Sequence, residues 1–519
     1  MSTERTESTE TAAEATPPEL PDIAEDDERL HQLGYPRVLR AQMNAFAQFA
    51  VPTSTISILT GPITVMIFAM NTGGPATMMW TWIVGGPLVL CVAIAMARIA
   101  SRYPVAAAVY FWTAKLAKHK VFTSFTVAWL NWLGKLAGTA AAGYSAALFI
   151  GAFASVQWGF QVSTVRTLLI FAVIIVGTGL LNALAVKAVG WLNTASVLVH
   201  GVGAVALVLA LLIMPKHHQS VGWVFTHFVN NTGFHQKWLV VGLGVLTLIY
   251  TMTGIDSAGD MAEESKGAQI NPSRAMVHSV LWSWVFGGFL IFAFMLGVQN
   301  YGNEVATPFG VAPAQILVDA IPGWVSTFFI LWIIVAQLMC VMTCQTAMPR
   351  ALWAMARDRG VPASGWLYRV SARTKVPVNA LIVGAVGSFA LGLPALKSPI
   401  LFAAITSVSG AALFVSYAVP IYLSIRPGTT FEPGPWNPPA ARLVGWTAIG
   451  YVIVATVLIC LPTTSQFMHI DSFNWTPVAL LVTLIGVSIW YVVYARNRYD
   501  GPVRYGSPEE LRALEADLA

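Results

Sequence analysis

Apolar stretches of about 20 residues recur along almost the whole chain and are separated by short polar segments. A helix of that length crosses the roughly 30 Å hydrocarbon core of a bilayer. The pattern therefore predicts an all-α polytopic membrane protein with about twelve transmembrane helices. The predicted spans, each good to a few residues at its ends, are 42–70, 78–100, 122–151, 165–186, 191–214, 238–262, 275–299, 322–345, 377–394, 400–424, 441–462 and 474–496.

The polar segments predict which side of the membrane each loop faces. If the N-terminus lies in the cytoplasm, 24 of the 29 lysines and arginines lie on the cytoplasmic side and four on the opposite side. Cytoplasmic loops are enriched in Lys and Arg, so we expect a multi-pass protein of the cell membrane with both termini in the cytoplasm. Residues 1–32 are acidic and nearly free of aromatic side chains, which predicts a disordered tail. Residues 498–519 are expected to form a second cytoplasmic tail.

Composition agrees with a membrane protein and excludes several other classes. Of the 519 residues, 56% are hydrophobic and 10% are charged, which is more apolar surface than a soluble domain of this size needs. The net charge of +5 follows from the sidedness of the loops, so no nucleic-acid partner is expected. The four cysteines lie in apolar stretches as small core residues, which predicts neither a disulfide framework, a metal site nor a cofactor. The chain has no HExxH, GxSxG or phosphate-loop motif, so it is not expected to be an enzyme.

The sixth span is interrupted near its middle. In GVLTLIYTMTGIDSAGDMAEES, which starts at Gly244, we expect the apolar helix to break from Thr253 to Ser257. Irregular backbone at bilayer depth is tolerated only where protein or water satisfies its freed groups, which indicates a cavity. A carboxylate there is costly unless it is paired or hydrated, so Asp256 is a candidate functional residue. Alternatively, the Asp256 side chain caps the second half-helix, and the two roles are compatible.

The first span contains a second candidate break. Pro62 has no amide hydrogen and crowds the carbonyl of Ile58, while Gly61 lowers the cost of local unwinding. The helix is therefore expected to break from Ser57 to Gly61. Freed carbonyls at such a break suit an ammonium group, and the amides that open the next half-helix suit a carboxylate. The alternative is a plain proline kink, which membrane helices often carry.

The two breaks occupy matching positions in the chain. They fall in the first and sixth spans, the same place in two consecutive groups of five. Interrupted helices in corresponding positions indicate an inverted-repeat transporter with its site at the midplane of the membrane. We therefore expect two consecutive repeats, repeat one at 42–214 and repeat two at 238–424.

Lys135 is a cation near the middle of the third span. About thirteen residues, or roughly 20 Å of helix, separate it from either end of that span, which is too far for its side chain to reach the interface. Lys135 must therefore face the protein interior, where it pairs with a structural partner, stays neutral or meets substrate. Lys135 and Asp256 are the clearest deep charges of opposite sign, so we hypothesise that they approach each other across the cavity.

Several ordered motifs resemble the amino acid, polyamine and organocation transporter superfamily, and within it the amino acid and choline transporter branch. They are SISILTGPI, NTGGP, LNALAVKAVGWLN, YTMTGIDSAGDMAEES, MARDRGVP, KVPVNA and SYAVPIYL. The resemblance covers a transporter domain over 33–497 and implies a five-plus-five inverted repeat with two extra helices, at 441–496. It implies that this domain carries small amines or amino acids by alternating access. It also implies substrate contacts at the two breaks, from Ser57, Ile58, Thr60 and Gly61 in the first span and from Thr253, Gly254, Ile255 and Asp256 in the sixth. Tyr250 stands where the branch often has a tryptophan that serves as an aromatic lid.

The chain also departs from that branch. Arg98 replaces a typical glutamate at the cytoplasmic end of the second span, and Ala107 and Ala108 replace paired glycines in the next loop. In the eighth span, Ala347 and Pro349 replace residues of a segment that is often rich in serine. These departures bear on the cytoplasmic gate and on ion coupling, which the resemblance alone does not carry over to this chain.

The residues favour protons over sodium as a coupling ion, with an uncoupled carrier as the alternative. A sodium site needs several converging oxygens, and Ala347 removes a hydroxyl beside Thr343 and Thr346. The candidates for a proton role are Lys135, Asp256 and His200, of which His200 is favoured as a structural hydrogen bonder instead.

We therefore expect a permease, embedded in membrane lipid, that moves a small amino acid with protons. The alternatives are a choline or polyamine carrier that uses Asp256 and the ring of Tyr250, an amino acid exchanger, and a transporter-like nutrient sensor without flux.

Overall fold

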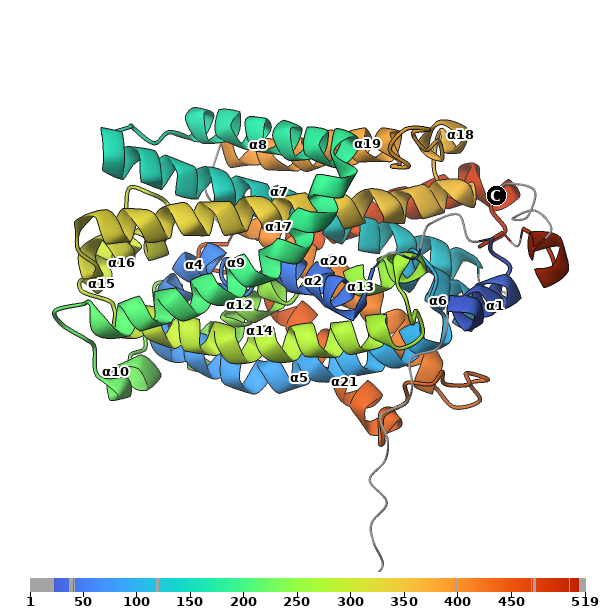
Figure 1. Cartoon of the computed structure of the whole chain (residues 1–519). Coiled ribbons are helices and arrows are strands. Elements are labelled where there is room, and N and C mark those ends of the chain that lie inside the picture. Colours follow the sequence, from blue (N-terminus) through green and yellow to red (C-terminus); the bar gives the residue numbers. More distant parts are fainter. Residues whose placement is uncertain are drawn as a thin grey trace, which may run out of the picture.

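The computed structural model describes residues 23–36, 41, 43–117, 121–396, 400–467, 469, 473–503 and 505–512. In this part of the chain the regular elements are helices, accompanied by two isolated β-bridges (Figure 1). The expectations for residues 1–22 and 513–519 of the two tails lie outside the described residues.

Ten of the described helical segments are long and apolar enough to cross a membrane. The first of them, Ala45–Asn71, is divided into α2 (Ala45–Ile56), α3 (Gly61–Thr64) and α4 (Met66–Asn71). The other nine are α5 (Gly74–Arg102), α7 (Val121–Trp158), α8 (Thr164–Leu184), α9 (Val186–Ile213), α14 (Asn271–Leu296), α17 (Gly323–Arg357), α20 (Ile400–Ile425), α21 (Ala441–Cys460) and α22 (Thr476–Val493).

Two of the twelve expected spans are shorter than a full membrane crossing. The sixth consists of α11 (Lys237–Leu243) and α12 (Val245–Thr251), followed after a break by α13 (Ser257–Asp260) and the 3₁₀ turn η1 (Ala262–Glu264). The ninth consists of α19 (Val378–Gly392) and η2 (Leu393–Leu396). A 15-residue helix such as α19 rises only about 22 Å, so length alone does not identify these two segments as spans.

The remaining short helices lie at the two ends of the bundle. Figure 1 shows α1, α6 and α18 at one end and α10, α15 and α16 at the other. We call the first the tail end, because it carries α1 and residues 505–512, and the second the far end. The short elements are α1 (Ile23–Leu33), α6 (Ala108–Ala117), α10 (Val221–Thr226), α15 (Tyr301–Val305), α16 (Ala312–Ala320), α18 (Ser364–Leu367) and η3 (Ala495–Asn497).

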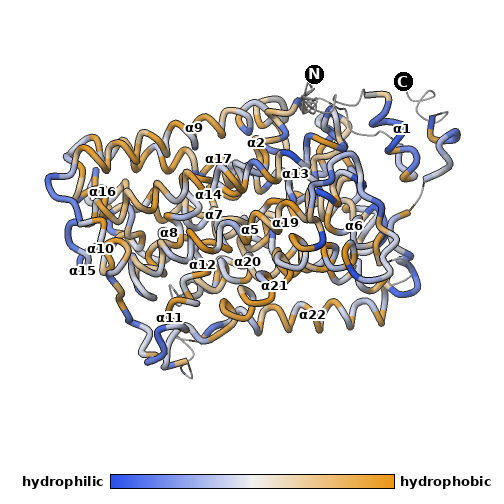
Figure 2. The backbone as a smooth tube through the Cα atoms, turned by 90° about the horizontal axis from the view of Figure 1, so that it is seen from below, coloured by the Kyte–Doolittle hydropathy of each residue, from blue (hydrophilic) through white to orange (hydrophobic). Residues whose placement is uncertain are grey.

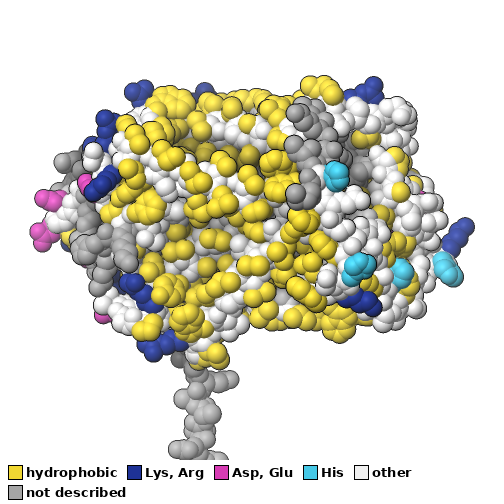
Figure 3. All heavy atoms as spheres, turned by 180° about the vertical axis from the view of Figure 1, so that it is seen from behind, with side chains coloured by type: hydrophobic (Ala, Val, Ile, Leu, Met, Phe, Trp, Pro, Cys, Tyr) yellow, Lys and Arg dark blue, Asp and Glu magenta, His cyan; other side chains and the backbone are white. Residues whose placement is uncertain are grey.

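A broad apolar belt surrounds the middle of the bundle. The backbone is mainly hydrophobic between the two ends and hydrophilic at both of them (Figure 2). On one face, hydrophobic side chains spread over the middle while Lys and Arg gather near the margins (Figure 3). Large side chains such as Val173 on α8, Leu198 on α9 and Val493 on α22 are exposed, as lipid-facing residues are. With ten candidate spans, the chain is a multi-pass membrane protein.

Both helix breaks occur where the sequence predicts them. Residues 57–60 form turns between α2 and α3, and Ser57 adopts a left-handed conformation with φ of 57°. Residues 252–256 form turns between α12 and α13, and Gly254 has φ of 87°. The first break is therefore more than a proline kink, because four consecutive residues leave the helix.

The two breaks touch each other through a reciprocal pair of glycines. A Cβ atom at Gly61 would lie 2.7 Å from Thr251 Cγ2, and a Cβ atom at Gly254 would collide with Thr55 Cγ2. Each glycine thus lets its own broken segment approach a threonine in the last helical turn before the other break. This contact brings the first and sixth spans together at the centre of the bundle.

The N-terminal tail is more ordered than its composition predicts. The expectation of disorder up to residue 32 is wrong for residues 23–32, which form most of α1. Leu30 and Leu33 are buried, and the carboxylate of Asp26 accepts hydrogen bonds from the amides of Gly267 (2.8 Å) and Ala268 (2.9 Å). An acidic segment stays solvated and disordered only when no hydrogen-bond donors are placed to bind its carboxylates. Here the loop after η1 supplies two buried amide donors to Asp26.

We expect Gly254→Ala to destabilise the protein by about 2–4 kcal/mol, because an alanine is strained at this φ and its methyl would overlap Thr55. Thermal unfolding of the purified protein in detergent measures the effect. Gly177→Ala is the control, since nothing lies within 4 Å of a Cβ at that helical position. A Gly254→Ala protein that melts with the wild type would contradict the close approach of the two breaks.

We expect Asp26→Ala to loosen α1 by about 1–3 kcal/mol, because two buried amides lose their acceptor. Faster trypsin cleavage after Arg29 and faster amide exchange in α1 report the loosening. Glu25→Ala, at an exposed neighbouring position, should behave as the wild type. Equal cleavage of all three proteins would show that Asp26 does not hold α1.

Candidate functional site

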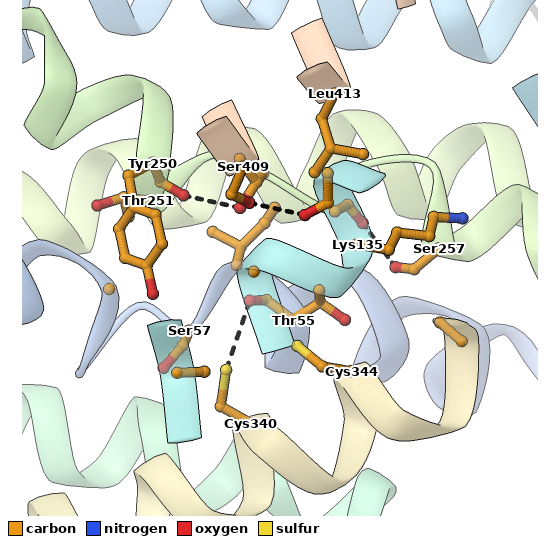
Figure 4. Close-up of a pocket in the computed structure, with 18 of the residues that line it drawn as sticks. Thr55, Ser57, Lys135, Tyr250, Thr251, Ser257, Cys340, Cys344, Ser409 and Leu413 are labelled. Carbon is orange, nitrogen blue, oxygen red and sulfur yellow. Dashed lines mark hydrogen bonds between the residues drawn. The ribbon is translucent and has the colours of Figure 1, made fainter. Parts of the chain in front are cut away.

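The central cavity lies between the two helix breaks. It encloses about 580 Å³ including its solvent-open part, and its walls come from the two broken spans together with α7, α17 and α20. Figure 4 shows Tyr250 and Thr251 on one side of this cavity and Cys340 and Cys344 on another.

Most of the residues expected to bind substrate line this cavity. They are Ser57, Thr60, Gly61, Lys135, Tyr250, Thr253, Gly254 and Asp256. Two others do not: Ile58 and Ile255 lie in the hydrophobic core instead, with 5% and 0% of their surface exposed. Their branched apolar side chains gain more from burial than from facing a polar cavity.

Lys135 faces the protein interior, as predicted, and lies between two carboxylates. Its Nζ is 2.9 Å from Asp256 Oδ2 and also donates to Asp260 Oδ2. The side chains of all three residues are at most 7% exposed. The hypothesised approach of Lys135 and Asp256 is therefore present in the structure, but as part of a triad rather than a pair.

Asp256 does not act as a helix cap. It stands at the residue before α13, yet its side chain makes no capping hydrogen bond. Its Oδ1 accepts from the Tyr417 hydroxyl (2.6 Å), and its Oδ2 accepts from Asn131 Nδ2 (2.9 Å) as well as from Lys135. The Tyr417 oxygen in turn accepts from the amide of Gly254 (3.3 Å). Donors from α7 and α20 thus fix this carboxylate at the second break.

His200 belongs to a separate hydrogen-bond chain at the first break. Its Nδ1 is 2.7 Å from the carbonyl of Ser196, which can only accept, so Nδ1 carries a proton. In the neutral ring Nε2 then accepts from the Ser57 hydroxyl (2.8 Å), and Ser57 is also hydrogen bonded to Thr60. His200 is fully buried and does not line the cavity, which is the structural hydrogen-bonding role that the sequence left open.

Sequence reasoning missed several residues of the site. Asp260 follows Asp256 by four residues and Asn131 precedes Lys135 by four, so helical i, i+4 spacing could have found both. Tyr417 has no such local signal, because only the tertiary fold brings α20 to the second break. Cys340 lies in the hydrophobic core and Cys344 packs against it, as expected, but both also line the cavity, and the Cys340 thiol donates to the carbonyl of Thr55 (3.6 Å).

An ion pair lies further along the sixth span toward the tail end. Arg350 Nε is 2.9 Å from Glu264 Oε1, and its Nη1 also donates to the carbonyl of Thr346. Arg98, one of the departures from the resembled branch, donates to Asn437 Oδ1 (2.8 Å) and lies over the ring of Phe431. Among the described residues, no group of three or more His, Cys, Asp or Glu is placed to hold a metal ion.

Comparison with known proteins identifies the family. A family model described as amino acid permease matches residues 46–488. Over 92% of this chain, it is 29% identical to the amino-acid permease BAT1 homolog of Oryza sativa and to the amino-acid permease BAT1 of Arabidopsis thaliana, covering 95% and 96% of those proteins. It is 27% identical to the GABA-specific permease of Saccharomyces cerevisiae over 95% of this chain and 88% of that protein. The chain therefore belongs to the amino acid permease family of the amino acid, polyamine and organocation superfamily, whose members are membrane transporters and not enzymes.

Proposed function

We propose that this protein is a secondary active carrier that moves a small neutral amino acid across the cell membrane by alternating access. The observation that carries the proposal is the central cavity, whose wall presents the ammonium of Lys135 and the carboxylate of Asp256 within 2.9 Å of each other. A zwitterion carries the complementary pair of charges, so it can exchange partners with these two residues. The name of the yeast relative makes γ-aminobutyrate the first substrate to try.

The proposed architecture is twelve spans arranged as a five-plus-five inverted repeat with two extra helices. The helix breaks in the first and sixth spans support it, because they occupy corresponding positions of the two repeats. The reciprocal contacts of Gly61 with Thr251 and of Gly254 with Thr55 add support, since each repeat contributes the same kind of contact. The substrate would lie where these segments meet.

We assign the tail end, and with it both termini, to the cytoplasm. Arg29, Arg102 and Arg357 lie at this end, beside α1, whereas Lys216 and Lys237 flank the loops around α10 at the far end. This distribution is the enrichment of cations that cytoplasmic loops carry. The ion pair between Arg350 and Glu264 would then contribute to closure of the cavity on the cytoplasmic side.

We propose protons as the coupling ion. Titratable side chains line the cavity, whereas the hydroxyls considered for sodium have other partners. Thr343 donates to Asn193 Oδ1 (2.9 Å) and Thr346 donates to Asn182 Oδ1 (2.7 Å), which ties both to neighbouring helices. Position 347 is alanine, so this segment offers no third hydroxyl beside them, and a sodium site needs several converging oxygens.

A carrier of choline-like cations is the second candidate, because the triad holds two carboxylates and one ammonium. A quaternary ammonium is usually recognised by several aromatic faces, and Tyr250 is the one aromatic side chain among the described residues of the cavity wall. The amino acid is therefore the better match.

The proposal is tested by uptake of labelled γ-aminobutyrate, alanine and choline into proteoliposomes, with and without an inward proton gradient. Uptake of an amino acid that rises with the gradient is the expected result. Uptake of choline alone would favour the organic-cation carrier, and preloaded liposomes that exchange but do not accumulate substrate would indicate an exchanger. No flux of any probe in either format would leave a sensor and overturn the carrier.

We expect Lys135→Met to weaken amino acid uptake at least about tenfold, because removal of one partner of a buried charge pair costs about 2–5 kcal/mol. Lys266→Met, at an exposed position, is the matched control and should transport as the wild type. The double variant Lys135→Met with Asp260→Asn keeps the net charge of the triad. If this variant folds but does not transport, the loss comes from the missing ammonium and not from misfolding. Unchanged uptake and pH dependence in Lys135→Met would end the proposed role of Lys135.

A further inference from the structure

The triad in the cavity wall carries one negative charge more than its ammonium balances. Lys135 contacts both Asp256 and Asp260, and all three side chains are buried. The next charged groups toward the tail end, Arg350 and Glu264, form their own ion pair and leave this excess in place. An unbalanced buried charge is costly, so the triad is stabilised when it takes up one positive charge.

The two carboxylates are held very differently. Asp256 receives three donors, from Tyr417, Asn131 and Lys135, which together stabilise its ionised form. For Asp260, Lys135 is the donor found among the described contacts. The backbone beside it is closely packed, since a Cβ at Gly259 would meet Ala108, Trp112 and Met276. The carboxylate that is easier to neutralise is therefore Asp260.

The positions of the two carboxylates divide their roles. Asp256 lines the cavity, whereas Asp260 lies one turn further along the sixth span and outside the cavity wall. Glu264, another turn on, faces Arg350 on α17. The charges that influence Asp260 electrostatically come from Lys135 on α7, Asp256 on its own segment and Arg350 on α17. Along the sixth span, Asp260 therefore lies between the cavity residue Asp256 and the ion pair of Glu264 at the tail end.

We propose, building on the carrier function above, that Asp260 binds the transported proton while Asp256 stays ionised and holds the ammonium of the substrate. With Asp260 protonated, Lys135 and Asp256 form a neutral pair that accepts a zwitterion, carboxylate to Lys135 and ammonium to Asp256. When Asp260 releases its proton toward the tail end, its carboxylate recaptures Lys135 and the substrate carboxylate loses its partner. Proton and amino acid then bind together and leave together. Because Asp260 holds one proton, one proton is transported with each amino acid.

The test compares exchange with coupling in proteoliposomes that use the labelled amino acid transported by the wild type. Asp260→Asn should retain exchange between internal and external substrate within about threefold of the wild type, because the neutral amide mimics the protonated carboxyl. It should lose gradient-driven accumulation and substrate-induced proton entry, read with a pH dye inside the liposomes. Its exchange should also lose the pH dependence of the wild type. Asp256→Asn should lose exchange and accumulation together.

Two controls keep the outcomes distinct. Glu304→Gln removes a buried carboxylate at the far end, where its oxygen accepts from the amides of Gln299 and Asn300, and should leave coupling intact. Asp260→Glu restores the carboxyl and should restore proton entry with a shifted pH profile, which also serves if Asp260→Asn fails to fold. Proton-driven accumulation in Asp260→Asn, or a pH profile of Asp260→Glu that superimposes on the wild type, would overturn the proposal. Wild-type exchange without proton entry would overturn the role of Asp260 alone, whereas absence of any wild-type exchange would overturn the carrier function as well.

Discussion

The interaction on which the central cavity depends is the pairing of the buried Lys135 ammonium with the carboxylates of Asp256 and Asp260. An isolated charge at this depth would be unstable, so each member of the triad requires the others. The ion pairs of the triad join α7 to the sixth span, and the hydrogen bond from Tyr417 to Asp256 joins α20 to the same cluster. A single polar cluster thus fixes the relative positions of three elements that are far apart in the sequence. Because a polar cluster inside a membrane tolerates few alternative partners, it also makes the site specific.

The second constraint is the backbone of the two interrupted spans. Residues that leave a helix inside a membrane need new hydrogen-bond partners, and here neighbouring side chains supply them. The Tyr417 oxygen accepts a hydrogen bond from the amide of Gly254. The Ser57 hydroxyl is hydrogen bonded to both Thr60 and His200. The close approach of the breaks requires glycine at positions 61 and 254, because a side chain at either would meet the opposite segment. Pairing the two interruptions therefore creates the cavity and stabilises it at the same time.

The tail end shows how distant parts of the chain close over the sixth span. The carboxylate of Asp26 on α1 accepts hydrogen bonds from two amides of the loop after η1. The guanidinium of Arg357 lies over the ring of Tyr35, and the amide of Tyr505 donates to the carbonyl of Gly34. The ion pair between Glu264 and Arg350 belongs to the same end of the sixth span. Movement of the sixth span at this end would require these contacts to loosen, so the N-terminal helix, the loop after η1 and the ion pair form one connected layer.

The sequence by itself determined the membrane class, the approximate limits of most spans and the positions of both helix breaks. These features depend on local properties, namely the length of apolar stretches, the missing amide of Pro62 and the conformational freedom of Gly61 and Gly254. It also determined that Lys135 must face inward, because helix length alone prevents this side chain from reaching water. Only the tertiary structure decided which groups meet Lys135, that Asp256 bonds to Tyr417 rather than capping α13, and that Ile58 and Ile255 lie in the core. It likewise decided that residues 23–33 form a docked helix, since the donors for Asp26 are more than 200 residues away in the chain. Local composition cannot reveal such partners, because the energy of a buried polar group depends on what the fold places beside it.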